Sequence, residues 1–195
     1  MVPYQLDGTA FIEWVDHTIM VSGIGFSSDD DEGLAIEYLY SIGMNHARRG
    51  MPKDAIFYFD KVLLIEPSHT RALFNKANAL GKLGKYEEAI LLYDSILKTT
   101  PAHSESLLNK GLAFHYLGRY DEAISCYDAI TALEPRNASA FYQTACTKAL
   151  QKKQSESLKA LERAILLDQQ FATKAGKDAD FSDLHGDPRF QALVS

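Results

Sequence analysis

Residues 73–101 read LFNKANALGKLGKYEEAILLYDSILKTTP, and residues 107–135 read LLNKGLAFHYLGRYDEAISCYDAITALEP. The second stretch has the same residue pattern as the first, 34 residues later. The two stretches end at Pro101 and Pro135. Pro67 precedes Pro101 by the same interval. A fixed period of this length indicates a repeat array, in which each unit stacks on its neighbours to bury a continuous core.

Four other positions keep the 34-residue register along the chain. They are Gly50, Gly84 and Gly118; Ala55, Ala89 and Ala123; Phe59, Tyr93 and Tyr127; and Asp60, Asp94 and Asp128. So many positions that repeat at the 34-residue interval of the prolines are not expected by chance. The period therefore describes the architecture of the chain.

Within one repeat, the apolar positions follow helical spacing. Leu73, Ala77 and Leu80 lie on one face of a helix because they are separated by four and three residues. Gly84 follows this helix, where glycine adopts the left-handed conformation of a helix end without penalty. A second helix then begins with acidic residues from Glu87 onward, which favour the positive end of the helix dipole. Each repeat is predicted to be a helix hairpin closed by proline.

This pattern resembles the tetratricopeptide-repeat (TPR) family. The family motif has a large apolar residue, Gly or Ala four residues later, then A-x-x-x-F/Y and a closing proline. After Leu39, Leu73 and Leu107, the matching positions are Gly43, Ala55, Phe59 and Pro67; Ala77, Ala89, Tyr93 and Pro101; and Gly111, Ala123, Tyr127 and Pro135. The resemblance implies an all-α fold, a right-handed α-solenoid of antiparallel TPR helix hairpins. We expect the small residues to mark close helix approaches and the aromatic residues to fill core seams.

The register divides residues 35–169 into four expected units. They run over about 36–69, 70–103, 104–137 and 138–171. The fourth is degenerate, because Ser157 replaces the second-helix alanine, Gln169 replaces the closing proline and Lys152 replaces the glycine. Atypical terminal repeats are common in stacked arrays.

Residues 170–195 are expected to form capping helices. Their sequence contains D-x-D-F-x-x-L followed by D-P-R-F-x-x-L, which resembles the segment that closes prokaryotic TPR arrays. Asp187 is placed to cap a last short helix, and Pro188 to occupy its first turn. The phenylalanines Phe181 and Phe190 would cover the exposed end of the solenoid.

Composition and charge argue against nucleic acid and membranes as partners. The 195-residue chain has a net charge of −6, and residues 1–34 contain acidic residues but no lysine or arginine. The chain has no basic stripe for nucleic acid and no apolar run long enough for a membrane span, so we expect neither as a partner. Its two cysteines, Cys126 and Cys146, are in no metal-ligand spacing, which favours free thiols in the cytoplasm.

The motifs expected of an enzyme are missing from the sequence. It contains no H-E-x-x-H, no glycine-rich phosphate loop and no G-x-S-x-G. His69 and His103 occupy the same turn position in successive repeats, and we expect both to be exposed loop residues. We therefore predict no catalytic residue, no metal and no cofactor.

The family resemblance implies that ligands lie in a concave groove lined by the first helices of the repeats. In that register an apolar row runs beside an amide row, a combination that suits a peptide backbone and its apolar side chains. The candidate groove residues are Tyr40, Met44, Arg71, Phe74, Asn75, Asn78, Leu108, Asn109, Tyr142 and Gln143. The predicted function is binding of a peptide or protein segment, as an adaptor or assembly scaffold.

Two alternative functions remain open from the sequence, and one segment remains unassigned. The chain could be a regulatory subunit or fragment of a TPR-containing enzyme, or a self-associating structural protein. Residues 1–34 form an acidic leader with helix-like and strand-like features. The leader is either a cap on the first repeat or a segment that occupies the groove of its own or another copy, which would allow self-association.

Overall fold

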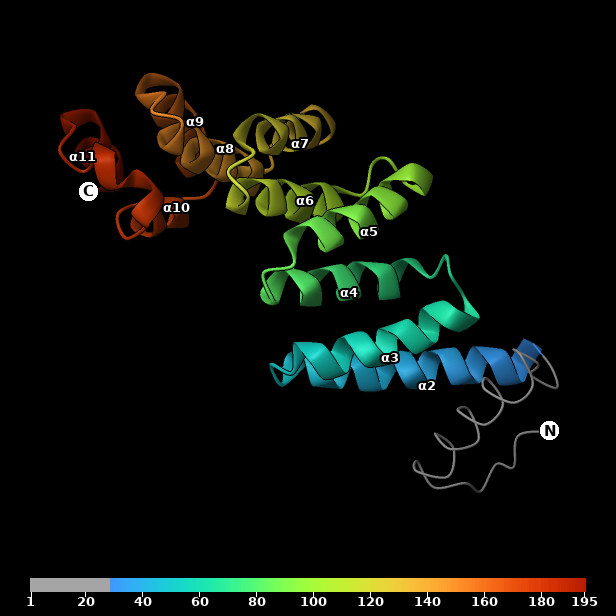
Figure 1. Ribbon diagram of the computed structural model, residues 1–195. Coiled ribbons are helices and arrows are strands. Elements are labelled where there is room, and N and C mark those ends of the chain that lie inside the picture. The colour runs from blue at the N-terminus through green and yellow to red at the C-terminus, as the bar shows by residue number, and fades with distance from the viewer. Residues whose placement is uncertain (1–28) are drawn as a thin grey trace. The chain divides into compact units, whose positions relative to one another are not determined.

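The computed structural model describes residues 29–195 (Figure 1). Most of the leader, and with it the alternative of a cap or a groove occupant, lies outside the described residues. The chain divides into two compact units, which meet in sequence between Leu83 and Gly84. Every regular element described in either unit is a helix, as the sequence predicted.

The first unit contains three helices within residues 29–83. They are α2 (Asp29–Arg48), α3 (Pro52–Ile65) and α4 (Thr70–Lys82), and α3 packs against both α2 and α4. The helix α2 begins inside the segment assigned to the leader.

In the second unit, each helix of the repeats packs against the next one along the chain (Figure 1). These helices are α5 (Tyr86–Thr99), α6 (Ser104–Tyr116), α7 (Tyr120–Leu133), α8 (Ala138–Leu150) and α9 (Gln154–Leu167). The C-terminal segment adds α10 (Gln170–Ala175), the 3-10 helix η1 (Ala179–Leu184) and α11 (Pro188–Val194). Contacts between sequence neighbours dominate, as in a solenoid.

Left-handed residues set the turns inside the hairpins. Gly50, Gly84 and Gly118 have φ angles of 73°, 75° and 74°. Lys152, which replaces glycine in the fourth repeat, adopts the same conformation with φ of 62°. The two helix ends also have the same type of backbone hydrogen bond. Gly118 N donates to the carbonyl oxygen three residues back, and Lys152 N donates to the equivalent oxygen at 2.9 Å. The turn geometry is therefore kept along the chain even where the residue is not glycine.

Small residues occur where an aromatic ring approaches a first helix. A Cβ atom built on Gly43 would lie 2.7 Å from Cε1 of Phe59, and one built on Gly111 would lie closer still to Cε1 of Tyr127. Both rings are fully buried. The repeat signature thus follows from packing, as expected.

The histidines at the repeat turns differ from the sequence expectation. His69 is only 9% exposed, and its Nδ1 accepts a hydrogen bond of 3.1 Å from Ala72 N at the start of α4. His103 Nδ1 accepts the equivalent bond from Ser106 N, also at 3.1 Å. The expectation of exposed loop residues was wrong, because an imidazole nitrogen can cap a helix in the way that an Asp or Asn side chain does.

The C-terminal segment packs on the last hairpin. The helix η1 contacts α8, and both α10 and α11 contact α9. Phe181 and Phe190 are 0% and 1% exposed. Asp187 Oδ1 accepts a 2.8 Å hydrogen bond from Arg189 N, and Pro188 occupies the first turn of α11. Within residues 29–195, no helix is both long and apolar enough to span a membrane.

Candidate functional site

In the first unit, three candidate groove residues meet between α2 and α4. Asn75 Nδ2 donates hydrogen bonds to the Tyr40 hydroxyl at 2.9 Å and to the Arg71 carbonyl oxygen at 2.8 Å. The Arg71 guanidinium carbon lies 4.6 Å from the centre of the Tyr40 ring, within the range of a cation–π contact. The structure therefore brings an amide, an aromatic ring and a cation together in the first unit.

Charge at this site is balanced locally. Arg71 also forms an ion pair with Glu37, and both side chains are more than half exposed, so solvent weakens the pair. Burial raises the pKa of the Tyr40 hydroxyl, and the nearby Arg71 guanidinium partly opposes that rise. Tyr40 remains a neutral donor and acceptor at physiological pH.

The other candidates of the first unit are half-buried. Met44 packs against the core formed by Leu39, Phe59 and their neighbours. Phe74 and Asn78 are also half-buried residues of α4, and neither is without an interaction partner. These residues are part of the packing as well as part of the helix surface.

In the second unit, three candidates are similarly half-buried. Leu108 packs against the core around Tyr127, and Asn109 forms a hydrogen bond with the Tyr93 hydroxyl. The side chain of Gln143 on α8 is half-buried, and the backbone carbonyl oxygen of this residue accepts a 2.8 Å hydrogen bond from the Thr147 hydroxyl. The amide side chains therefore lie on helix surfaces that are partly open to solvent.

Tyr142 is a correction to the predicted groove. Its side chain is 1% exposed, and its ring stacks on Phe171 at a centroid distance of 4.6 Å. Its hydroxyl donates to Asp178 Oδ2 at 2.6 Å. The C-terminal segment covers the position that earlier repeats leave partly open, so Tyr142 belongs to the core of the second unit.

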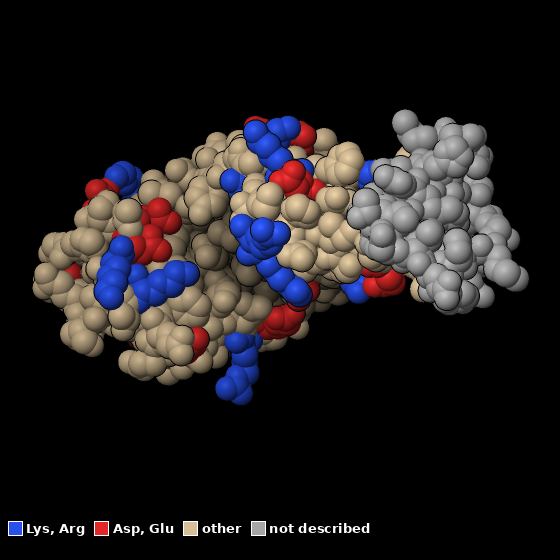
Figure 2. Space-filling model, turned by 90° about the horizontal axis from the view of Figure 1, so that it is seen from below, with Lys and Arg blue, Asp and Glu red and all other residues tan. Residues whose placement is uncertain are grey.

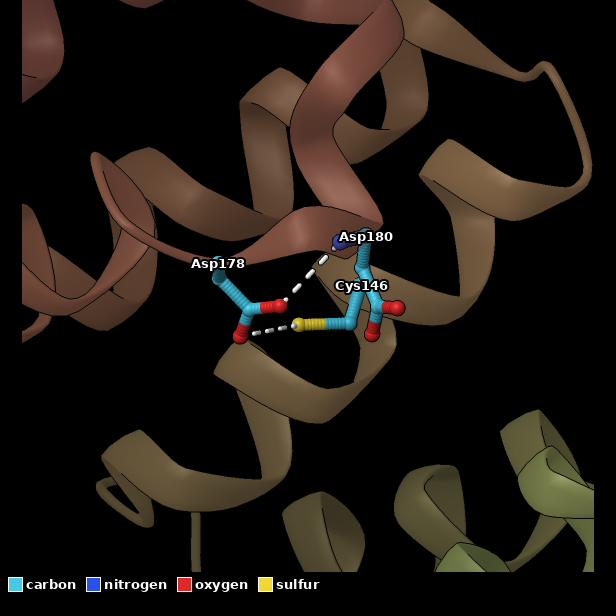
Figure 3. Close-up of side chains that lie close together, drawn as sticks. All are labelled: Cys146, Asp178 and Asp180. Carbon is cyan, nitrogen blue, oxygen red and sulfur yellow. Dashed lines mark hydrogen bonds between the residues drawn. The ribbon is translucent and has the colours of Figure 1, made fainter.

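A polar cluster that the sequence did not predict contains Asp178, the hydrogen-bond partner of Tyr142. Figure 3 shows its three members, Cys146, Asp178 and Asp180. Cys146 Sγ and carboxylate oxygens of Asp178 and Asp180 all lie within 4.8 Å of one another. These are atoms of the types that ligate metals. Asp178 Oδ1 already accepts from Asp180 N at 3.1 Å, and the Cys146 thiol donates to Asp178 Oδ2 at 3.9 Å. In this arrangement, hydrogen bonds satisfy the cluster.

Protonation favours the same interpretation of the cluster. Burial, reinforced by the charges of Asp178 and Asp180, strongly raises the pKa of the Cys146 thiol, whereas metal binding requires the thiolate. A hydrogen bond from His115 lowers the pKa of the Asp180 carboxyl. His115 Nε2 lies 3.3 Å from Asp180 Oδ2, so the cluster ties α6 to η1. The D-x-D-F motif was the only sequence signal for it.

The second unit also contains a cavity of about 680 Å³ between α7, α8 and α9. Its lining is largely apolar, with charged side chains at intervals. The lining residues are Asp128, Thr131, Phe141, Thr144, Lys148, Glu156, Lys159, Ala160, Glu162, Arg163 and Leu166. None of them is a predicted groove residue, so this cavity is a separate candidate site.

The surface charge is mixed. On the face shown in Figure 2, lysine and arginine side chains alternate with aspartate and glutamate side chains over a mostly uncharged surface. A nucleic-acid interface needs a surface of predominantly positive charge. The described part of this face shows basic and acidic side chains mixed rather than a continuous basic stripe.

Comparison with protein families identifies the repeat. A family model described as "Anaphase-promoting complex, cyclosome, subunit 3" matches residues 48–130, and one described as "Tetratricopeptide repeat" matches residues 108–175. The chain contains TPR repeats. TPR proteins are generally non-catalytic interaction modules, which agrees with the helix hairpins and with the interaction role expected from the sequence.

Three similar TPR or uncharacterised proteins illustrate the relationship. The uncharacterised protein MJ0572 of Methanocaldococcus jannaschii is 43% identical over 58 residues, which cover 30% of this chain and 67% of that protein. The structure of a TPR protein from Parabacteroides merdae has a TM-score of 0.72 at 19% identity, covering 95% of this chain and 76% of that one. YrrB, described as a TPR protein with an unusual peptide-binding site, has a TM-score of 0.66 at 21% identity, covering 88% and 93%. At these identities, the two structures support the fold alone.

Proposed function

We propose that this TPR chain is a non-catalytic module that binds a peptide or protein segment on its first helices and serves as an adaptor or assembly scaffold. The observation that carries the proposal is the arrangement of Tyr40, Arg71 and Asn75. Asn75 is held by two hydrogen bonds, and Arg71 rests on the Tyr40 ring. Side chains that are held in place before binding lose less conformational entropy when a ligand arrives.

The chemistry of this arrangement suits a peptide main chain. Both described hydrogen bonds of Asn75 use its Nδ2, so its Oδ1 is an acceptor that these bonds do not occupy. Phe74 next to it and Leu108 in the second unit are half-buried apolar side chains that can contact apolar side chains of a ligand. An amide that orients the backbone beside apolar contacts is a common mode of peptide recognition.

The C-terminal segment, residues 170–195, is proposed to act as the terminal cap of the array. Its burial of Phe181, Phe190 and Tyr142 supports this role. Covering Tyr142 restricts the proposed ligand surface to the repeats before it. In the first unit the proposed interaction surface is formed by α2 and α4. In the second unit the candidates that stay partly open are Leu108, Asn109 and Gln143.

A selection experiment that starts from random peptides tests the proposed function. A peptide display library is selected on the purified chain, and the affinity of recovered peptides is measured for the variants Asn75→Ala and Asn109→Ala. Loss of a central contact should weaken binding by about tenfold or more. Leu91→Ala, at a position 66% exposed on α5, is the control and should bind normally. Peptides that bind all three variants equally well would refute the proposed surface.

A further inference from the structure

One ion pair recurs in the register of the repeats. Lys76 Nζ on α4 lies 2.6 Å from Asp60 Oδ1 on α3, and Lys110 Nζ on α6 lies 2.5 Å from Asp94 Oδ1 on α5. In both pairs the lysine lies on a first helix and the aspartate on the helix before it. The lysine side chains are only 22% and 20% exposed, so each lies in a slot between helices.

The third copy of this slot has no lysine. Asp128 on α7 keeps the aspartate position, but Thr144 on α8 stands where the two earlier repeats have lysine. Among residues 29–195, the Asp128 carboxylate forms no ion pair. The repeat thus retains the anionic half of the pair and lacks the cationic half.

The missing side chain coincides with a cavity. Asp128 and Thr144 both line the cavity of about 680 Å³ between α7, α8 and α9. Thr131, which also lines it, stands in the register of the larger Leu97. Two substitutions by smaller side chains explain why this slot is open while the slot of Lys110 is filled.

We propose that this cavity is a docking site for a lysine side chain of a partner protein. The partner's ammonium group would pair with Asp128 as Lys110 pairs with Asp94. Its apolar stem would lie on Phe141 and Ala160, which line the same cavity. This site shares no residue with the proposed peptide surface, so either proposal can fail without the other.

Hydrogen-bond acceptors in the cavity match an ammonium group. The Thr131 hydroxyl donates to the Asp128 carbonyl oxygen at 3.0 Å, and the Thr144 hydroxyl donates to the Ala140 carbonyl oxygen at 3.0 Å. Each hydroxyl hydrogen is therefore used, and the lone pairs of each oxygen can still accept. With the Asp128 carboxylate, they supply acceptors for the three N–H donors of a lysine ammonium.

The remaining charges make the attraction local to Asp128. The cavity is lined by as many basic as acidic side chains, so it has no net attraction for cations in general. Lys148 is paired with Glu156 at 2.7 Å, and the Arg163 guanidinium lies 5.8 Å from the centre of the Phe141 ring. Recognition depends on placing an ammonium group at Asp128.

Restoring the missing lysine within the chain provides the first test. Thr144→Lys should raise the melting temperature above that of Thr144→Met by about 1–4 °C, because both fill the cavity but only lysine can pair with Asp128. Adding Asp128→Asn should abolish this difference. If Thr144→Met is as stable as Thr144→Lys, the slot recognises volume alone and the proposal is wrong.

A titration provides the second test and uses the full chain. The probe is N-acetyl-lysine methylamide, and the control is its uncharged counterpart, N-acetyl-norleucine methylamide. Binding is followed by NMR through the methyl signals of Thr131, Thr144 and Ala160. The lysine probe should shift these signals saturably and bind at least about threefold more tightly than norleucine, as one ion pair predicts. Asp128→Asn should remove the preference, and Thr144→Lys should prevent binding. Equal binding of both probes, unchanged binding by Thr144→Lys, or no saturable shift would each overturn the proposal.

Discussion

Replacing Lys152 with glycine should stabilise the second unit relative to replacing it with alanine, by about 1 kcal/mol. Lys152 has φ of 62°, in the region where a side chain on an L-residue costs about 1–2 kcal/mol. Glycine removes that cost but loses more backbone entropy on folding, which offsets part of the gain. Gly118 at the equivalent position has φ of 74°, so the turn accepts glycine without rearrangement.

The alanine variant separates backbone strain from side-chain loss. Lys152 forms an ion pair with Asp183, and both Lys152→Ala and Lys152→Gly remove it. The two side chains are 71% and 52% exposed, so the pair contributes little, about 0–1 kcal/mol. The difference between the two variants therefore reports the backbone conformation alone.

Thermal unfolding followed by circular dichroism measures the effect. A difference of about 1 kcal/mol corresponds to about 2–4 °C in melting temperature for a chain of this size. Gly118→Ala is the reciprocal control and should destabilise the unit by a similar amount. A glycine variant at position 152 that melts no higher than the alanine variant would show that the left-handed turn stores no strain.

Three further outcomes are expected. Gly111→Ala should be less stable than wild type by about 1 kcal/mol, because its Cβ overpacks the facing ring, whereas Gly81→Ala, with no atom within 4 Å of the added Cβ, should be neutral or stabilising in thermal unfolding. His115 lowers the pKa of the Asp180 carboxyl, so this contact stabilises the folded protein above pH about 4. The stabilisation is lost as the pH falls through the folded-state pKa. Asp180→Asn should therefore reduce the loss of stability at acidic pH, measured by denaturation at a series of pH values. Tyr142→Phe should cost about 1–3 kcal/mol in chemical denaturation, because its hydroxyl donates to a carboxylate.

The helix boundaries could be predicted from the sequence because residues next to each helix end determine them. The helix α3 ends at Ile65, and the residue after its C-cap is Pro67. Proline disfavours helical geometry in the residue before it, so the repeat of the prolines determined where second helices end. Gly84 likewise follows the C-cap of α4 with a left-handed φ. Both signals act over one or two residues, and a single sequence therefore contains them completely.

The burial of Tyr142 could not be predicted from its position in the 34-residue repeat. The 34-residue period assigns Tyr142 the same environment as Tyr40, because it treats every repeat alike. The last repeat has a different neighbour, and Phe171 and Asp178 from the C-terminal segment cover the ring and bind the hydroxyl. Environment at the end of an array depends on the three-dimensional path of the chain after the last repeat, which periodicity does not describe.

The degenerate repeat also shows which substitutions the fold compensates. Ser157 replaces an alanine at a fully buried position, and its hydroxyl donates to the Ala145 carbonyl oxygen at 2.8 Å, which removes the cost of an unsatisfied buried group. Lys152 replaces a glycine and gains an ion pair with Asp183. In both cases the new side chain found a partner within the chain.

Thr144 is different from these compensated substitutions. It stands in place of the lysine of a recurring ion pair and leaves Asp128 at the cavity, where no basic side chain of residues 29–195 forms an ion pair with it. The Asp128 side chain is exposed, so water can solvate its carboxylate while the position of the cation stays open. Retention of Asp128 beside an open slot is expected if a lysine from another protein completes the pair, and the Thr144→Lys variant would then gain stability while losing that partner.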